Sequence, residues 1–150
     1  MELPEEVRER FRRYGRSGGL ERARRMSPAA RSAVARRAAT TRWIRHRFGS
    51  ATFEPLGLPG GDMVDSGLAD LASGRTTIES LALSLAAPRL RREGVPIGVV
   101  LEDPERRLFA WLSRMDGDLA HARYNAYLRQ LVSFADACRL ARVDRKQRAT

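Results

Sequence analysis

The chain has 150 residues, of which 43% are hydrophobic, and a formal net charge of +10 at pH 7. This length suits one ordinary domain or two small ones, and the hydrophobic fraction predicts that most of the chain folds. The single cysteine, Cys138, excludes an internal disulfide and a thiolate metal cluster. No apolar run approaches the roughly 18 residues of a membrane span, and the acidic N-terminus is unlike a signal peptide. We therefore expect a cytoplasmic protein that does not contact a membrane.

The charge is distributed unevenly along the chain. Residues 1–50 hold 14 arginines and 5 acidic residues, residues 51–138 hold 9 arginines and 12 acidic residues, and residues 139–150 hold 5 basic residues and one acidic residue. A stretch from Gly49 to Gly61 is rich in glycine and proline, which is typical of a linker. We predict an all-α fold in four parts: a small basic helix-turn-helix-like unit at 1–49, a linker at 50–61, a C-terminal helical bundle at 62–139 and a basic tail at 140–150.

Three helices are expected in the basic unit. The first spans Leu3–Tyr14, the glycine-rich segment Gly15–Gly19 breaks the chain, and a second short helix spans Leu20–Met26. A third, longer helix begins after Ser27, because serine is a preferred N-cap and proline is tolerated at the first helical position, and it runs to Arg47. At 100° per residue, its apolar side gathers the residues expected to form a core: Ala30, Val34, Thr41, Ile44 and Phe48.

Arginines dominate the region from Gly18 to Trp43, where seven arginines are opposed by Glu21 alone. Small side chains lie among the arginines of the long helix and allow a close approach to a phosphate backbone or a groove: Ala35, Ala38 and Ala39. We predict nucleic-acid contacts from six arginines: Arg22, Arg24, Arg25, Arg31, Arg42 and Arg45. The alternative is a solvated arginine face produced by codon bias, which the 27 arginines against one lysine support. Codon bias explains arginine in place of lysine but not the scarcity of acidic residues, so we favour nucleic-acid binding.

The same region resembles a motif that recurs in bacterial proteins, written GG-x-A-R-A, then S-P, then A-R-x-A-A-x-x-R-W. The matching residues are Gly18, Gly19, Ala23, Arg24, Ser27, Pro28, Ala35, Arg36, Ala38, Ala39, Arg42 and Trp43. The resemblance implies a small helical unit that contacts DNA and occurs in regulators and in some antitoxins. Three helices with a long basic third are also similar in arrangement to helix-turn-helix and homeodomain-like folds.

Helical patterns continue after the glycine- and proline-rich stretch. Three apolar residues within that stretch indicate that it docks on a neighbouring element: Phe53, Leu56 and Leu58. A short helix is expected over Met63–Ser73. Thr76 and Glu79 predict a capping box for the next helix, which Pro88 should kink or restart.

The C-terminal half is expected to contain two further helices after an extended connector over Val95–Leu101. The first begins after Asp103, with proline at its first position, and a tight turn at 116–118 separates it from the longest helix of the chain. The apolar stripe of the longest helix consists of Tyr124, Leu128, Leu131, Phe134, Ala135 and Cys138.

The sequence offers no convergent set of catalytic groups. His46 and His121 stand in different predicted segments, no histidine pair has metal-ligand spacing, and no glycine-rich phosphate loop is present. We therefore predict that the protein is not an enzyme and uses no metal or cofactor. Tyr124 and Asn125 follow His121 within about one turn of the last helix, where these side chains either make internal hydrogen bonds or belong to an interface.

Five segments of the body, GRTT at 74–77, LALSLAAPRL at 81–90, DPERRL at 103–108, HARYNA at 121–126 and RQLVSF at 129–134, resemble small antitoxins encoded beside nucleotidyltransferase toxins of the AbiEii or MenT type. The resemblance implies that the body binds and neutralises a cognate toxin. The residues expected at that interface are Arg89, Arg123, Tyr124, Asn125, Tyr127 and Arg129. The basic N-terminal unit is an addition to the pattern of those antitoxins.

Two functional hypotheses follow from the sequence. The first is an antitoxin and transcriptional regulator, which neutralises a nucleotidyltransferase-like toxin and binds the operator DNA of its own operon; this hypothesis allows a homodimer. The second is a small RNA-binding or ribosome-associated protein in which the basic head and the basic tail both contact phosphates. An enzyme of unknown chemistry is the least favoured alternative.

Overall fold

The computed structural model describes the backbone of residues 4–148 and the side chains of residues 4–141, so most of the predicted basic tail lies outside the described side chains. Within this range the chain forms helices and no strand, which confirms the predicted all-α fold. The elements in chain order are α1 (Glu5–Arg25), α2 (Pro28–Phe48), the 3-10 helix η1 (Glu54–Leu56), α3 (Gly61–Ala72), α4 (Ile78–Arg92), α5 (Pro104–Asp116), the 3-10 helix η2 (Gly117–Leu119) and α6 (Ala120–Arg148).

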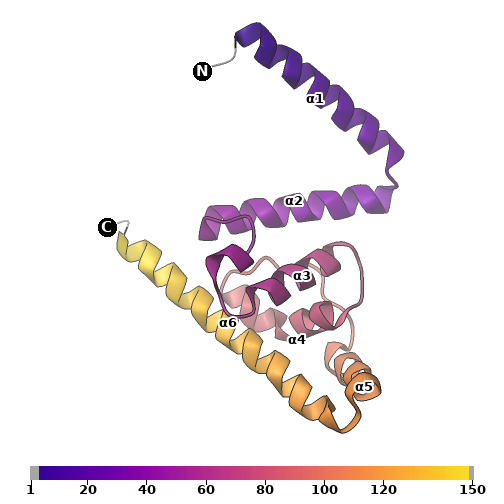
Figure 1. Ribbon diagram of the computed structural model, residues 1–150, viewed down its shortest axis with the longest axis vertical. Coiled ribbons are helices and arrows are strands. Elements are labelled where there is room, and N and C mark those ends of the chain that lie inside the picture. The colour runs from indigo at the N-terminus through magenta and orange to yellow at the C-terminus, as the bar shows by residue number, and fades with distance from the viewer. Residues whose placement is uncertain (1–3, 149–150) are drawn as a thin grey trace.

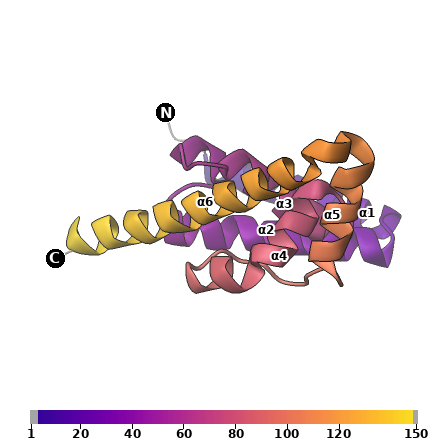
Figure 2. The same ribbon diagram turned by 90° about the horizontal axis from the view of Figure 1, so that it is seen from below.

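Helices α3 to α6 form the bundle that holds most of the core (Figure 1). Helix α4 contributes the fully buried Leu81, Leu83 and Leu90, and α6 contributes Leu131 and Phe134. The last turns of α6 extend beyond the other helices of the bundle (Figure 2). The predicted stripe of the last helix is thus buried over its second half, where it meets the bundle.

Helix α2 packs across the bundle through the C-terminal half of its apolar side. Ile44 is 2% exposed and belongs to the same core cluster as the residues of α3 to α6, whereas Val34, nearly three turns earlier, is 54% exposed. The predicted core residues of this helix therefore do not form a separate core. Instead, the second half of α2 shares the core of the bundle.

The stretch predicted as a linker at 50–61 is a packed connection. Phe53 is fully buried, and its ring meets the rings of Phe48 and Phe134 edge-on, with centroid distances of 5.2 and 5.0 Å. The carboxylate of Asp65 accepts hydrogen bonds from the backbone N–H groups of Phe53 and Glu54 at 2.9 Å. The glycine and proline residues shape turns around these contacts rather than providing a flexible spacer, so the expected docking of this stretch is confirmed.

The prediction of three helices in the basic unit is wrong, because α1 runs without a break from Glu5 to Arg25. A glycine inside a helix is about 1 kcal/mol less favourable than alanine, but it keeps its N–H donor and does not end the helix. A Cβ atom added at Gly15, Gly18 or Gly19 would meet nothing within 4 Å. Helix α1 has no buried residue, so the head contains two helices and no core of its own.

Side chains cap the first turns of α2 and α4 by hydrogen-bonding to backbone N–H groups. Ser27 caps α2 as predicted, since its hydroxyl accepts from Ala30 N at 3.2 Å. The capping box of α4 lies one residue later than predicted and consists of Thr77 and Ser80. The Thr77 hydroxyl also donates to Asp70 at 2.7 Å, which anchors this cap to α3. Helix α4 continues through Pro88 to Arg92.

We predict that Phe53→Ala lowers the free energy of unfolding by about 3–5 kcal/mol, because it removes a fully buried ring that joins α2 to α6. The control is Leu20→Ala on α1, a residue that is 58% exposed and should change stability by about 0.5 kcal/mol or less. Urea unfolding followed by circular dichroism measures both. If Phe53→Ala changes the free energy of unfolding as little as the control does, the 50–61 stretch behaves as a spacer in solution.

Candidate nucleic-acid interface

The two N-terminal helices form the arms of a V next to the bundle (Figure 1). Met26 and Ser27, between the two helices, have extended backbone angles that turn the chain sharply. Each arm has 21 residues, or about 31 Å of helix. Helix α2 therefore has the bundle on one side and α1 on the other.

A cleft of about 350 Å³ lies between the two arms near the vertex of the V. Its lining residues come from both helices and are mostly small or flexible: Gly19, Arg22, Ala23, Met26, Arg31, Val34, Ala35 and Ala38. Two of the predicted nucleic-acid-binding arginines, Arg22 and Arg31, thus lie on opposite arms of one cleft. Because glycine and alanine line the space between them, an extended phosphate backbone can approach both helices closely.

Three predicted arginines share the side of α2 that points away from the bundle. Arg42 follows Arg31 by about three helical turns and lies within about 20° of it on the helix circumference, and Arg45 lies within about 60° of Arg42. All three are exposed, whereas Ile44, on the opposite side of the helix, is buried. The structure therefore places these three arginines along one exposed edge.

The other three arginines of α2 turn elsewhere. The Arg37 guanidinium donates to Ser73 Oγ at 3.1 Å, the Arg47 guanidinium lies 5.0 Å from the centre of the Trp43 ring, and Arg36 lines a second cavity. Helix α2 carries six arginines and no acidic residue. The outward-facing arginines consequently have no opposite charge on their own helix.

The remaining predicted arginines, Arg24 and Arg25, lie in the last turn of α1. They share the carboxylate of Glu21 at 4.0 and 3.3 Å, and their side chains are 80% and 78% exposed. Ion pairs this exposed contribute little stability, so a phosphate can compete with Glu21 for both arginines. All six predicted nucleic-acid-binding arginines are exposed on the two arms.

Sequence reasoning missed Arg8 and Arg12. They lie on the same side of α1 as Gly19, about three turns and two turns before it, and so continue the basic lining of the V along the first arm. Both guanidinium groups approach the carboxylate of Glu5, each at 3.9 Å. The expected break at Gly15–Gly19 hid this alignment, which the helical period reveals once α1 is continuous.

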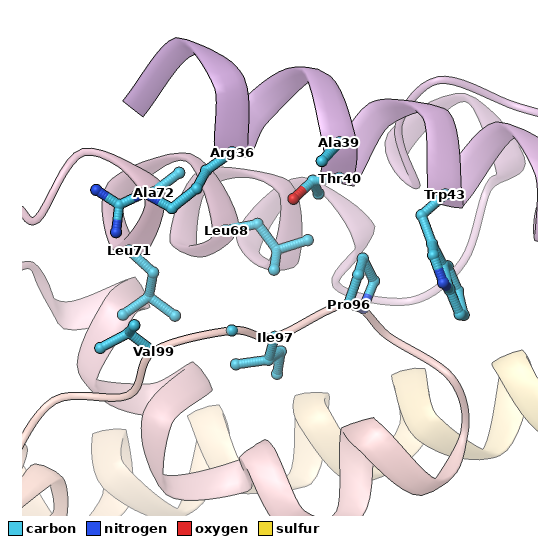
Figure 3. A pocket seen from close by; sticks show the side chains of 11 residues that line it. Arg36, Ala39, Thr40, Trp43, Leu68, Leu71, Ala72, Pro96, Ile97 and Val99 are labelled. Carbon is cyan, nitrogen blue, oxygen red and sulfur yellow. The ribbon is translucent and has the colours of Figure 1, made fainter. Parts of the chain in front are cut away.

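The second cavity, of about 380 Å³, lies between α2, α3 and the connector that follows α4 (Figure 3). Its lining residues are Arg36, Ala39, Thr40, Trp43, Leu68, Leu71, Ala72, Pro96, Ile97, Gly98 and Val99. Figure 3 shows Arg36 and Trp43 at opposite ends of this row of side chains. The cavity is largely apolar and lies on the bundle side of α2, away from the outward-facing arginines.

The residues predicted to bind a protein partner make several contacts within the chain. Tyr124 is partly buried, its hydroxyl donates to Glu105 at 3.4 Å, and its ring packs edge-on against Phe109. Burial raises the pKa of the Tyr124 phenol above its ordinary value, and the nearby charge and hydrogen bond of Glu105 raise it further. His121 is exposed and packs on Phe109 with a ring-centroid distance of 4.6 Å. Asn125 is exposed.

The arginines of this predicted partner set are spread over the bundle. Arg89 donates to Asp136 at 3.0 Å and joins α4 to α6, while Arg123 donates to Asp116 at 3.3 Å near the α5–α6 turn. Arg129 is exposed on α6. Tyr127 is partly buried against the core. These residues do not converge on one polar site.

Three large apolar side chains are exposed near the α5–α6 turn. Trp111, Met115 and Leu119 are 37%, 63% and 66% exposed. Trp111 and Met115 are one turn apart on α5, and Leu119 ends η2.

The described residues contain no group of three or more histidine, cysteine or acidic side chains suited to hold a metal ion. None of the helices in the described part of the chain combines the length and the apolar character needed to cross a membrane. A scan against protein-family models, a search of curated proteins and a search of solved structures each return no match for this chain.

We predict that Glu105→Gln lowers the pKa of Tyr124, because it removes the adjacent negative charge, while burial keeps that pKa above the ordinary value. Ultraviolet absorbance titration, with Tyr124→Phe to assign the transition, measures the shift. Glu102→Gln, which removes an acid three residues earlier in the chain that does not contact Tyr124, is the control and should leave the transition unchanged. An unchanged pKa in Glu105→Gln would show that the phenol and the carboxylate do not meet in solution.

Proposed function

We propose that the chain is a DNA-binding protein that holds duplex DNA with the exposed arginines of α1 and α2. One observation carries this proposal: α2 has six arginines and no acidic residue. Three of these arginines lie along an exposed edge of the helix, beside small residues. Arginine pairs well with phosphate oxygens, and Ala35 and Ala38 allow the helix backbone to approach them.

The shape of the V favours DNA over the alternative of double-stranded RNA. Helix α1 has no buried residue and stands clear of the bundle, so the side of α1 that lines the cleft can face a groove while α2 follows the phosphates. The major groove of B-DNA, about 12 Å wide, admits a helix, whereas the deep major groove of A-form RNA does not. The RNA-binding hypothesis remains the alternative for single-stranded targets.

We further propose that the bundle binds a protein partner, and that this partner is the nucleotidyltransferase-like toxin implied by the resemblance. The exposed Trp111, Met115 and Leu119 support a protein interface at the α5–α6 turn, because aromatic residues and methionine are enriched in such interfaces relative to the rest of the surface. Arg123 lies beside this surface and is suited to its rim. Together the two proposals describe an antitoxin that also regulates transcription in the cytoplasm.

For DNA binding, we predict that Arg31→Ala with Arg42→Ala weakens binding to a duplex from the promoter of its own gene. The slope of log affinity against log salt should fall by about two units, one for each lost phosphate contact. Fluorescence anisotropy over a range of salt concentrations measures both quantities. The control is Arg106→Ala with Arg114→Ala, which removes the same charge from α5 and should have the smaller effect.

A second double variant tests whether DNA binding requires close approach of the helix backbone or only the overall positive charge of the protein. Ala35→Leu with Ala38→Leu keeps every charge but fills the cleft between the arms, so it should weaken binding without lowering the charge of the protein. If only net charge matters, this pair binds like the parent and the proposed interface is wrong. Stronger binding to RNA than to DNA would favour the alternative function.

For the protein partner, we predict that Met115→Ser with Leu119→Ser abolishes co-purification with the product of the neighbouring toxin gene and abolishes rescue of growth. Both side chains are exposed, so the bundle should remain folded. Val99→Ser, at a residue that is 68% exposed on the connector, is the control and should retain rescue. A neighbouring gene whose product is harmless would refute the antitoxin proposal while leaving the DNA-binding proposal intact.

A further inference from the structure

Helix α1 is long, exposed and without a neighbour over most of its length. It has 21 residues, none of them buried, and meets α2 only near the vertex of the V. Three internal glycines each disfavour the helix by about 1 kcal/mol, and most helices in proteins gain their stability from packing of an apolar face, which α1 lacks over most of its length. A helix of this kind gains stability when another surface covers it.

One side of α1 carries an uncovered apolar stripe. Val7, Phe11 and Tyr14 follow one another at spacings of four and three residues, and Phe11 and Tyr14 are 66% and 68% exposed. Gly15 and Gly18 continue this side, with open space where a Cβ atom would stand. The stripe therefore combines two aromatic side chains with two positions that have room to receive them.

The charges of α1 indicate which partner fits and in which direction. Residues 5–9 carry three glutamates and one arginine, residues 10–16 carry four arginines, and residues 21–25 carry three arginines with Glu21. A second α1 in antiparallel orientation places the acidic end of each helix beside the basic end of the other. A parallel second copy would place like charges together.

We propose that two copies of this chain pair through an antiparallel contact between their α1 helices, with the two-fold axis between Tyr14 and Gly15. In this register Tyr14 meets Gly15 of the second copy, and Phe11 meets Gly18 of the second copy. Glycine at these positions lets the helices approach closely and gives each aromatic ring a place to pack. The long stem of Arg22 from the second copy covers Val7.

This pairing leaves most of the cleft between the arms open, and Arg22, which lines that cleft, contributes only its aliphatic stem to the contact between the copies. The stripe lies about 90° around α1 from the side that lines the cleft between the arms. The dimer thus presents two clefts related by a two-fold axis, the symmetry that suits two DNA half-sites. The proposed dimer does not depend on the proposed function, because it is inferred from the surface of α1 and is tested without nucleic acid.

The first test is the mass of the full-length protein by sedimentation equilibrium over a range of concentrations. The parent chain should be a dimer, and Phe11→Glu with Tyr14→Glu should weaken association by at least about tenfold. Leu20→Glu, on the opposite side of α1 and 58% exposed, is the control and should remain dimeric. Circular dichroism should show the same folded core in all three, since no α1 residue is buried. A monomeric parent, or a dimer that survives the double substitution, overturns the proposal.

The second test is the register, read by disulfide cross-linking. Mixing Val7→Cys chains with Arg22→Cys chains should give a cross-linked pair, because these positions face each other. Val7→Cys alone should not cross-link, since the two copies of residue 7 are about 22 Å apart along the antiparallel helices. The parent chain, whose Cys138 is buried, is the control. Efficient cross-linking of Val7→Cys with itself would establish a parallel contact and overturn the proposed one.

Discussion

The position of every arginine on α2 depends on the contact of three phenylalanine rings. Phe48 at the end of α2 meets Phe53 at an interplanar angle of 70°, and Phe53 meets Phe134 of α6 at 89°. Edge-to-face pairs add about 0.5–1.5 kcal/mol each to the burial of the rings themselves. Phe53 is held from the other side, because its backbone N–H donates to the Asp65 carboxylate. These contacts fix the direction in which α2 leaves the bundle, and with it the side on which Arg31, Arg42 and Arg45 lie.

Helix α2 divides its length between two kinds of environment. Its second half buries Ile44 and packs against α3, and this apolar contact opposes the mutual repulsion of six arginines on one helix. Two of the inward-turning arginines are also partnered, Arg37 by Ser73 and Arg47 by Trp43. The basic edge can therefore remain without acidic neighbours, since packing and not ion pairing holds the helix in place.

The sequence was informative wherever local chemistry determines the structure, and less so where tertiary contacts decide. The Ser27 cap, the continuation of α2 to Gly49 and the buried side of α6 all follow from residue type and helical period. The glycines of α1 suggested a break, because glycine has a low helix propensity. Helix propensity alone does not determine whether a helix ends at such residues, and α1 continues through them. The exposed edge of α2 was predictable from the wheel, but the cleft was not. It needs the bend between the arms, and the spacing in the sequence does not encode that bend.

Helix α1 has no buried residue, and it exposes both basic and aromatic side chains. Helix α1 has one side that lines the basic cleft and another that carries Phe11 and Tyr14, and these sides are separated around the helix. A contact that orders α1 through its aromatic stripe removes conformational freedom that nucleic-acid binding would otherwise have to remove. Self-association and binding in the cleft are then expected to favour one another, and Arg22 contributes to both, with its stem in the contact between copies and its guanidinium at the cleft. The coupling arises because both events order the same helix, and the aromatic stripe and the cleft side of that helix face different directions.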